Sequence, residues 1–158
     1  MKRLYIFLLA GLFFIACEDG RQVDTNIDTV VYIVNSDLQE ISVSESENTY
    51  ELWVYKGGYN EESITVTLSV DETVLDDYNS SKGTSYKIIP STNYSLDASA
   101  ITLGSSKDSE YTDYITITFS SVSDLSSGNY VLPIVASCDN SDLVNEDKNT
   151  VLLKVSVE

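Results

Sequence analysis

Along most of the chain, hydrophobic residues alternate with polar ones. The clearest example is 64–70, ITVTLSV, in which isoleucine, valine and leucine alternate with threonine and serine. A period of two is typical of strands that bury one face and leave the other to solvent. The same pattern predicts further strands, whose apolar positions are Val30, Tyr32 and Val34; Ile41 and Val43; Leu52 and Val54; Ile115, Ile117 and Phe119; Tyr130, Leu132, Ile134 and Ala136; and Val151, Leu153, Val155 and Val157.

Turn-forming residues separate these runs. Clusters of glycine, serine, asparagine and aspartate lie at Gly57-Gly58, 80–83, 104–106, 126–128 and 139–142. About seven strands with one apolar face predict an all-β fold: an immunoglobulin-like, antiparallel β-sandwich with Greek-key connections.

One short helix is expected to interrupt the strands. Asp71 can cap a helix over 72–79, acidic residues suit its first turn, and Gly83 lies just beyond its end. Because so short a helix is unstable alone, we expect it to lie against the edge of the sandwich.

The strand that begins at Tyr130 carries two further signals. The spacing of Leu125, Gly128 and Tyr130 fits a tyrosine corner, in which the tyrosine hydroxyl bonds to upstream backbone. The alternative is an ordinary aromatic residue at the start of a strand. Pro133 has no N–H for a ladder, which predicts an edge strand or a bulge.

The N-terminus has the pattern of a lipoprotein signal peptide. Lys2 and Arg3 precede an apolar run over 4–14, and a small residue followed by Cys17 ends it. The run is shorter than the roughly 20 residues that a membrane-spanning helix needs. We therefore predict that 1–16 is removed and that Cys17 is lipidated.

The next segment is polar and has no periodicity, so we interpret 17–28 as the lipidated cysteine and a flexible tether, with the sandwich domain over 29–158. The signal departs from most lipoboxes at Phe14, where leucine is usual. Glu18-Asp19 resembles the export signal of some Bacteroidetes lipoproteins; a generic polar linker is the alternative. The expected location is the outer membrane, facing the exterior.

Composition excludes several classes of function. The formal net charge is −16, which does not suit binding to nucleic acid or to anionic lipid headgroups. The chain has no histidine, the commonest general base and a common metal ligand. We predict no catalytic residues, no metal and no cofactor. Cys138 is expected to be a buried structural residue near a strand end rather than a reactive thiol.

An ordered set of short motifs resembles a known family. In chain order, these motifs are Val31-Tyr32-Ile33, Leu52 to Gly58, Ile64 to Leu68, Tyr78-Asn79, Gly83 to Tyr86, Ile89-Pro90, Tyr94, Gly128 to Ile134 and Asn145-Glu146. The set resembles the Bacteroidetes surface-lipoprotein N-terminal domain known as domain of unknown function 1735.

The resemblance implies the first module of a longer surface lipoprotein encoded with glycan-uptake machinery. A glycoside hydrolase, discoidin-like or lectin-like module usually follows in such proteins, whereas this sequence stops at Glu158, where we expect the domain to end. The family has no agreed catalytic residues, so the resemblance does not imply an enzyme.

An aromatic cluster is the candidate binding site. Trp53 and Tyr55 alternate with Leu52 and Val54, and Tyr59 follows at the turn. If a hairpin turns at Gly57-Gly58, the two rings lie beside Thr65 and Thr67, on a face that suits the C–H surface of sugars. The alternative is that Trp53 packs inside the sandwich, as many sandwich tryptophans do.

The acidic segments have a weaker interpretation. Residues 139–142 and 145–147 carry oxygen ligands that suit calcium but lack the spacing of an EF-hand; a solvated acidic loop is the better prediction. Adjacent carboxylates at 61–62 and 76–77 carry little information in so acidic a chain.

Together these features predict a non-catalytic, lipid-anchored surface module that binds or presents glycans. The alternative is a structural or adhesive spacer that docks protein partners through an exposed edge strand.

Overall fold

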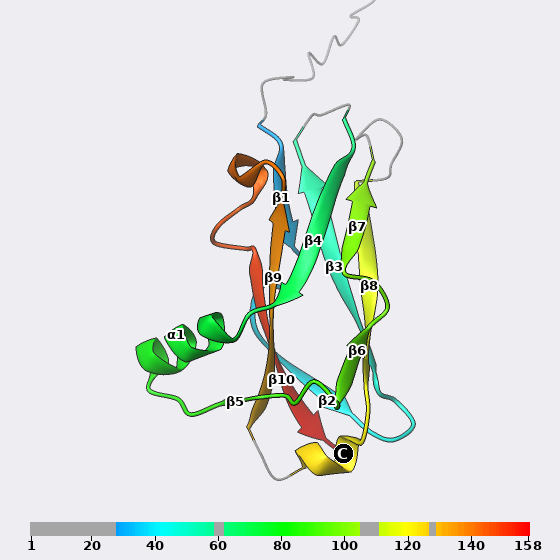
Figure 1. Cartoon of the computed structure of the whole chain (residues 1–158), viewed down its shortest axis with the longest axis vertical. Coiled ribbons are helices and arrows are strands. Elements are labelled where there is room, and N and C mark those ends of the chain that lie inside the picture. The colour runs from blue at the N-terminus through cyan, green and yellow to red at the C-terminus, as the bar shows by residue number, and fades with distance from the viewer. Residues whose placement is uncertain (1–27, 59–61, 105–110, 127–128) are drawn as a thin grey trace, which may run out of the picture.

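Two β-sheets pack face to face in this protein, and one helix lies outside them (Figure 1). The computed structural model describes residues 28–58, 62–104, 111–126 and 129–158. The predicted signal peptide, Cys17, most of the tether and Tyr59 lie outside the described residues. Of the described helices, none is both long enough and apolar enough to cross a membrane.

The first sheet has four strands, all paired antiparallel, in the order β1-β3-β8-β6. Their bounds are Val30–Ile33 for β1, Thr49–Gly57 for β3, Thr112–Phe119 for β8 and Tyr94–Leu96 for β6. We call it the four-stranded sheet.

The second sheet has six strands, in the order β2-β10-β9-β4-β7, with β5 pairing with β9 off this path. Their bounds are Asp37–Val43 for β2, Thr150–Val157 for β10, Tyr130–Cys138 for β9, Ile64–Val70 for β4, Ala100–Leu103 for β7 and Lys87–Ile88 for β5. Short 3-10 helices η1 and η2 span Val122–Leu125 and Ser141–Leu143.

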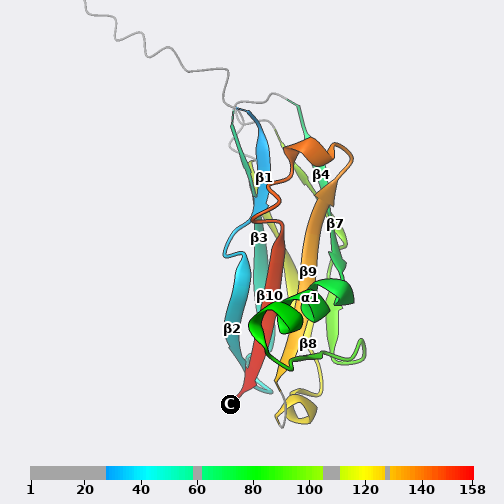
Figure 2. The same cartoon turned by 90° about the vertical axis from the view of Figure 1, so that its left-hand side faces the viewer.

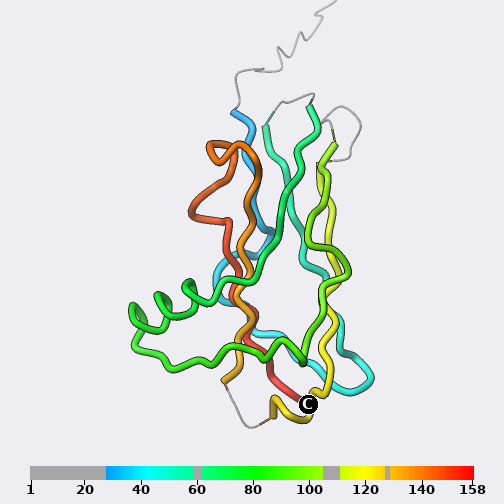
Figure 3. Tube along the Cα trace, viewed as in Figure 1, coloured from blue at the N-terminus to red at the C-terminus, as the bar shows by residue number. Residues whose placement is uncertain are grey.

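The predicted β-sandwich with one short helix is confirmed. The described residues form ten strands rather than about seven, and two pairings, β2 with β10 and β5 with β9, are parallel. The chain passes from β1 in one sheet to β2 in the other, where β2 pairs with the last strand, β10 (Figure 3). The immunoglobulin-like Greek-key detail stays a prediction.

The core lies between the sheets and is made by the alternating apolar residues. Leu52 and Val54 are fully buried, as predicted. In β1, however, Val31 and Ile33 are buried and Tyr32 faces outward, so the predicted phase of this strand was wrong. The run VVYIV is apolar throughout, so alternation cannot fix which face is inside, and a one-residue slip exchanges the faces.

The predicted hairpin at Gly57-Gly58 was also wrong, because β3 and β4 belong to different sheets. The backbone explains why residue 58 is a glycine. Gly58 has φ of +81°, and a Cβ there would collide with the carbonyl oxygen of Asp28. The crossing between the sheets separates Trp53 and Tyr55 from Thr65 and Thr67.

Helix α1 spans Glu72–Lys82, three residues longer than predicted, and begins and ends as its caps require. The Asp71 side chain accepts a hydrogen bond from Thr73 N at 2.9 Å, and Gly83 ends the helix with φ of +67°.

Its expected place at the sandwich edge was wrong, because α1 lies across the outer face of the six-stranded sheet, over β9 and β10 (Figure 2). There Leu75 packs on Val131 and Leu152, all three buried. These strands carry apolar residues on both faces, and the outward ones need a cover.

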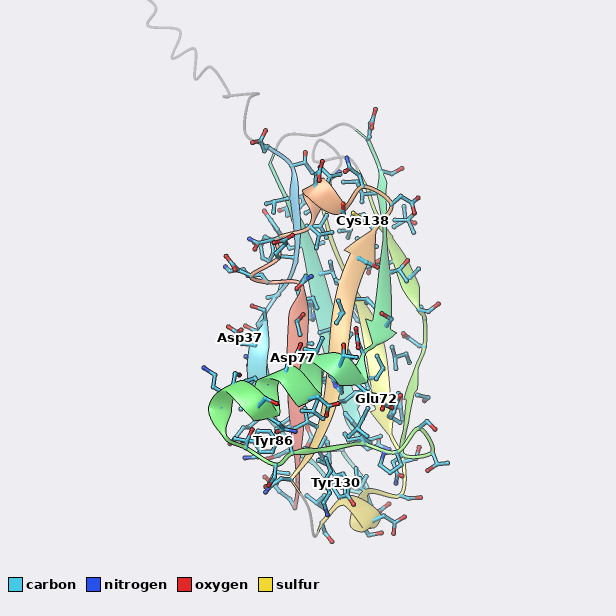
Figure 4. The ribbon with its side chains drawn as sticks, turned by 60° about the vertical axis from the view of Figure 1, so that its left-hand side comes forward. Asp37, Glu72, Asp77, Tyr86, Tyr130 and Cys138 are labelled. Atoms are coloured by element: carbon cyan, nitrogen blue, oxygen red, sulfur yellow. The ribbon has the colours of Figure 1, made fainter. Side chains whose placement is uncertain are left out.

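The motif Tyr78-Asn79…Gly83 to Tyr86 closes the loop after α1. Asn79 Oδ1 accepts from Tyr86 N and Thr84 Oγ1, each at 2.9 Å, and Asn79 Nδ2 donates to Tyr86 O at 2.9 Å. The rings of Tyr78 and Tyr86 stack with centroids 6.2 Å apart. Tyr86, in the segment that follows α1, is labelled in Figure 4. This part of the family pattern therefore has a structural role.

The edge or bulge predicted from Pro133 was wrong: β9 lies between β10 and β4, and its register with β10 runs from Thr150 to Val155 without interruption. The ladder to β4 ends at Ile134, and the ladder to β5 covers Tyr130 and Val131. Pro133 occupies the gap between the two ladders, where a missing N–H costs little.

Two predictions near the ends of β9 remain partly open. Tyr130 is half-buried at the strand start, but residues 127–128 lie outside the described part, so the tyrosine corner stays a prediction. Cys138 ends the strand as expected and is half-buried rather than buried, and its Sγ donates to Asn140 O at 2.9 Å.

Candidate functional site

The outer face of the four-stranded sheet carries a group of aromatic rings. Because Leu52 and Val54 point into the core, the alternation of β3 turns Trp53 and Tyr55 outward. Tyr32 of β1, Tyr114 of β8 and Tyr111, just before β8, contact these two rings. We call the five the aromatic platform: Tyr32, Trp53, Tyr55, Tyr111 and Tyr114. Among the described residues α1 is the only α-helix, and it lies on the other sheet (Figure 1).

The centre of the platform is a pair of rings on adjacent strands. Trp53 and Tyr114 are directly opposite in the β3–β8 register, with ring centroids 4.5 Å apart and planes inclined by 38°. Trp53 is 37% exposed and Tyr114 is 40% exposed. The alternative in which Trp53 packs inside the sandwich is therefore wrong.

The remaining rings extend the platform toward β1. Tyr32 lies opposite Tyr55, with ring centroids 5.1 Å apart, and Tyr111 meets Tyr55 edge-on at 5.3 Å. Burial and the neighbouring Tyr55 raise the pKa of Tyr32. Like any tyrosine hydroxyl at neutral pH, that of Tyr32 is protonated and can donate a hydrogen bond.

Polar groups border the rings. Trp53 Nε1 donates to Glu51 Oε2 at 3.1 Å, and Glu51 lies opposite Thr116 in the register. At the other end, Lys148 Nζ lies 5.4 Å from the centroid of the Tyr32 ring, within range of a cation–π interaction. Flat apolar surfaces with polar groups at the margin can stack on sugar rings and hydrogen-bond their hydroxyls.

The structure brings together only part of the predicted site. Trp53 and Tyr55 lie on one exposed face, as the alternation of β3 indicated. The predicted neighbours Thr65 and Thr67 are exposed on the other sheet, so that part of the prediction was wrong. The third predicted residue, Tyr59, lies outside the described residues.

Three platform residues were missed by sequence reasoning. Tyr114 had a usable signal, since it alternates with the buried Ile115 and Ile117 and so had to face outward. Tyr32 was hidden by the uniformly apolar run around it. Tyr111 precedes β8, where no alternation identifies its face.

The acidic loops make local hydrogen bonds. Asn140 Oδ1 accepts from Asp142 N at 3.2 Å and Asn145 Oδ1 from Asp147 N at 3.0 Å, so both asparagines stabilise turns. Within the described ranges, no three His, Cys, Asp or Glu side chains gather where they could hold a metal ion.

Comparison with known proteins defines the family. A family model described as an N-terminal domain matches residues 25–143, well over half of the chain. The chain belongs to this family of N-terminal domains, and the resemblance to domain of unknown function 1735 is confirmed. A multidomain protein from Bacteroides ovatus that includes this domain has the same fold, with a TM-score of 0.61 and 16% identity over 81% of this chain and 44% of that one.

Other solved structures share the fold. A candidate carbohydrate-binding protein from Bacteroides ovatus matches with a TM-score of 0.67 and 23% identity, over 80% of this chain and 36% of that one. EndoBT-3987 from Bacteroides thetaiotamicron, solved with a Man5GlcNAc product, matches with a TM-score of 0.58 and 18% identity, over 75% and 28% respectively. This chain therefore spans less than half of each protein. No curated protein matches it.

Proposed function

We propose that this domain is a non-catalytic glycan-binding module, attached to the outer membrane by a lipid on Cys17 and facing the cell exterior. The observation that carries the glycan-binding proposal is the exposed Trp53–Tyr114 pair. Exposing two adjacent large rings loses the benefit of burying them, so a binding role accounts for their position.

The chemistry of the platform favours a saccharide. The rings offer apolar surface to sugar C–H groups, while Glu51 and Tyr32 border them with an acceptor and a donor. The platform crosses β1, β3 and β8, so a glycan of several sugar units can contact more than one ring. We therefore expect affinity to rise with the length of the oligosaccharide.

The structural neighbours support a glycan-related role. One is a candidate carbohydrate-binding protein, and another was solved with an oligosaccharide product. The shared domain is only part of each of them, so transfer of binding to this chain is our proposal.

A second candidate function is a spacer or adhesive module that docks protein partners. The seven-residue strand β2 forms one end of the strand order in the six-stranded sheet, where an added strand can pair with it. This function predicts stable complexes in detergent extracts that survive Trp53→Ala.

A glycan array probed with the purified full chain tests the main proposal. We expect binding to at least one polysaccharide that Trp53→Ala abolishes. Tyr78→Ala is the matched control, because it removes a ring from α1 on the opposite side of the molecule. A folded wild-type protein that binds no glycan, or binding that Trp53→Ala leaves intact, would contradict the platform as the site.

The anchor requires a separate test. Mass spectrometry of the protein from its native membrane should find acyl chains on Cys17, and Cys17→Ser should release the protein from the membrane. Protease treatment of intact cells should digest the domain if it faces outward.

A further inference from the structure

Glu51 is fixed beside the centre of the aromatic platform. It lies two residues before Trp53 on β3, so both side chains are on the same face of the sheet. The hydrogen bond from Trp53 Nε1 to Glu51 Oε2, at 3.1 Å, holds the carboxylate against the edge of the indole. Both residues are exposed, so a sugar stacked on the indole meets this carboxylate.

Two more carboxylates are held by backbone amides of β8, the strand that carries Tyr114. Asp113 Oδ1 accepts from Tyr114 N at 2.8 Å, and Asp97 Oδ1 accepts from Thr116 N at 2.9 Å. Among the described residues, Lys148 lies over a platform ring, at the Tyr32 end. Glu51 is thus the carboxylate in contact with the Trp53 ring, and Asp97 and Asp113 add negative charge along β8.

A charged sugar and an uncharged sugar interact differently with the Glu51 carboxylate. A carboxylate or sulfate on a sugar stacked over Trp53 would lie within several ångströms of Glu51, and two like charges so close repel each other in the partly water-excluded contact. The hydroxyls of an uncharged sugar can instead donate to the same carboxylate, a charge-assisted hydrogen bond.

We propose that Glu51 is a specificity-determining residue, which makes the platform select uncharged glycans and reject those bearing carboxylates or sulfates. The proposal rests on the glycan-binding function proposed above and adds the class of glycan. The expected discrimination is roughly tenfold in dissociation constant, and it should shrink as salt screens the repulsion.

The test compares glycans that differ only in charge. The probes are cellohexaose, mannohexaose and galactohexaose, each beside the same hexasaccharide with its free C6 hydroxyls oxidised to carboxylates. Calorimetry with the full chain gives the ratio of dissociation constants for each pair, at about 20 mM and about 300 mM salt, where screening differs strongly.

Glu51→Gln is the informative variant, because glutamine keeps an oxygen that can accept from Trp53 Nε1 and removes only the charge. We expect it to reduce the oxidised-to-neutral ratio roughly tenfold. Glu72→Gln makes the same charge change at the start of α1, on the other sheet (Figure 4), and should leave the ratio unchanged.

Each outcome decides a separate question. Failure of all six sugars to bind would contradict the proposed function and this inference with it. A neutral sugar that binds no better than its oxidised form, or a ratio that Glu51→Gln leaves unchanged, would overturn the inference and leave glycan binding intact. Preference for the oxidised form, lost in Lys148→Gln, would assign selectivity to the opposite end of the platform.

Discussion

The two sheets of this protein differ most on their outer faces. On the six-stranded sheet, Val131 and Leu152 point outward and are buried beneath Leu75 of α1. On the four-stranded sheet, Trp53 and Tyr114 point outward and remain more than one-third exposed. One apolar outer face is thus covered by a helix of the chain itself, whereas the described part of the chain leaves the two central rings of the other face partly exposed.

The difference teaches how structural and functional hydrophobic residues can be separated in a sandwich. Outward aliphatic residues under a helix serve stability, and the motifs that place the helix, such as Tyr78-Asn79, are stability motifs too. Outward aromatic residues without a cover make a small contribution to folding and are available to a ligand. The predictions below test this division, from the largest expected effect to the smallest.

The covered face should be the more sensitive to truncation. Leu75→Ala leaves a cavity between α1 and the sheet, and should lower the free energy of unfolding by about 2–5 kcal/mol in urea titration. It should not change glycan specificity, since α1 is on the opposite side from the platform. A loss below about 1 kcal/mol would show that the helix is not an essential cover.

Asn79→Ala should be the next most severe change. It removes one donor and one acceptor that together make three hydrogen bonds to Thr84 and Tyr86, with an expected loss of about 2–3 kcal/mol. The matched control is Ser80→Ala, at an exposed position on the same helix, where surface substitutions typically change stability by about 0.5 kcal/mol or less. Equal effects would mean that the network contributes nothing specific.

The open face should tolerate truncation of its rings. Trp53→Ala and Tyr114→Ala should each cost less than about 2 kcal/mol, because both side chains are partly exposed already. A double-mutant cycle should show a coupling of about 0.5–1.5 kcal/mol between the paired rings. Losses as large as that of Leu75→Ala would contradict the division between the faces.

The smallest expected effect is the pH dependence of the helix N-cap. Hydrogen bonds from Thr73 lower the pKa of Asp71. A depressed folded-state pKa gives stability that is present above the unfolded value of about 3.9 and is lost as pH falls through the folded value. Comparing unfolding at pH 5 and pH 2.5, the wild type should lose slightly more stability than Asp71→Asn, which keeps the cap without the charge.

The fold was largely predictable because the inner faces alternate cleanly. Strands β3, β4 and β8, and the caps of α1, followed from local patterns that physical chemistry makes specific. Where a run was apolar on both faces, as around Tyr32 and Pro133, the pattern did not identify the face or the neighbouring strand. Those depend on pairings between distant segments, such as β9 with both β4 and β5.

The candidate site was predictable only in its β3 half. Alternation along one strand placed Trp53 and Tyr55 outward, but the partner strand was wrongly taken to be β4. The pairing that brings Tyr114 to Trp53 joins residues 61 positions apart in sequence (114 minus 53), and no local signal encodes it.

The most direct test of the open platform uses its own tryptophan. Trp53 is the only tryptophan in the chain, so fluorescence excited at wavelengths that tyrosine does not absorb reports on the platform alone. The full chain is titrated with a neutral oligosaccharide that calorimetry has shown to bind. Because the sugar displaces water from the indole, the Trp53 emission should change in intensity and shift to shorter wavelength. The dissociation constant from this titration should equal the calorimetric one. Binding seen by calorimetry with unchanged Trp53 emission would contradict the platform as the glycan site.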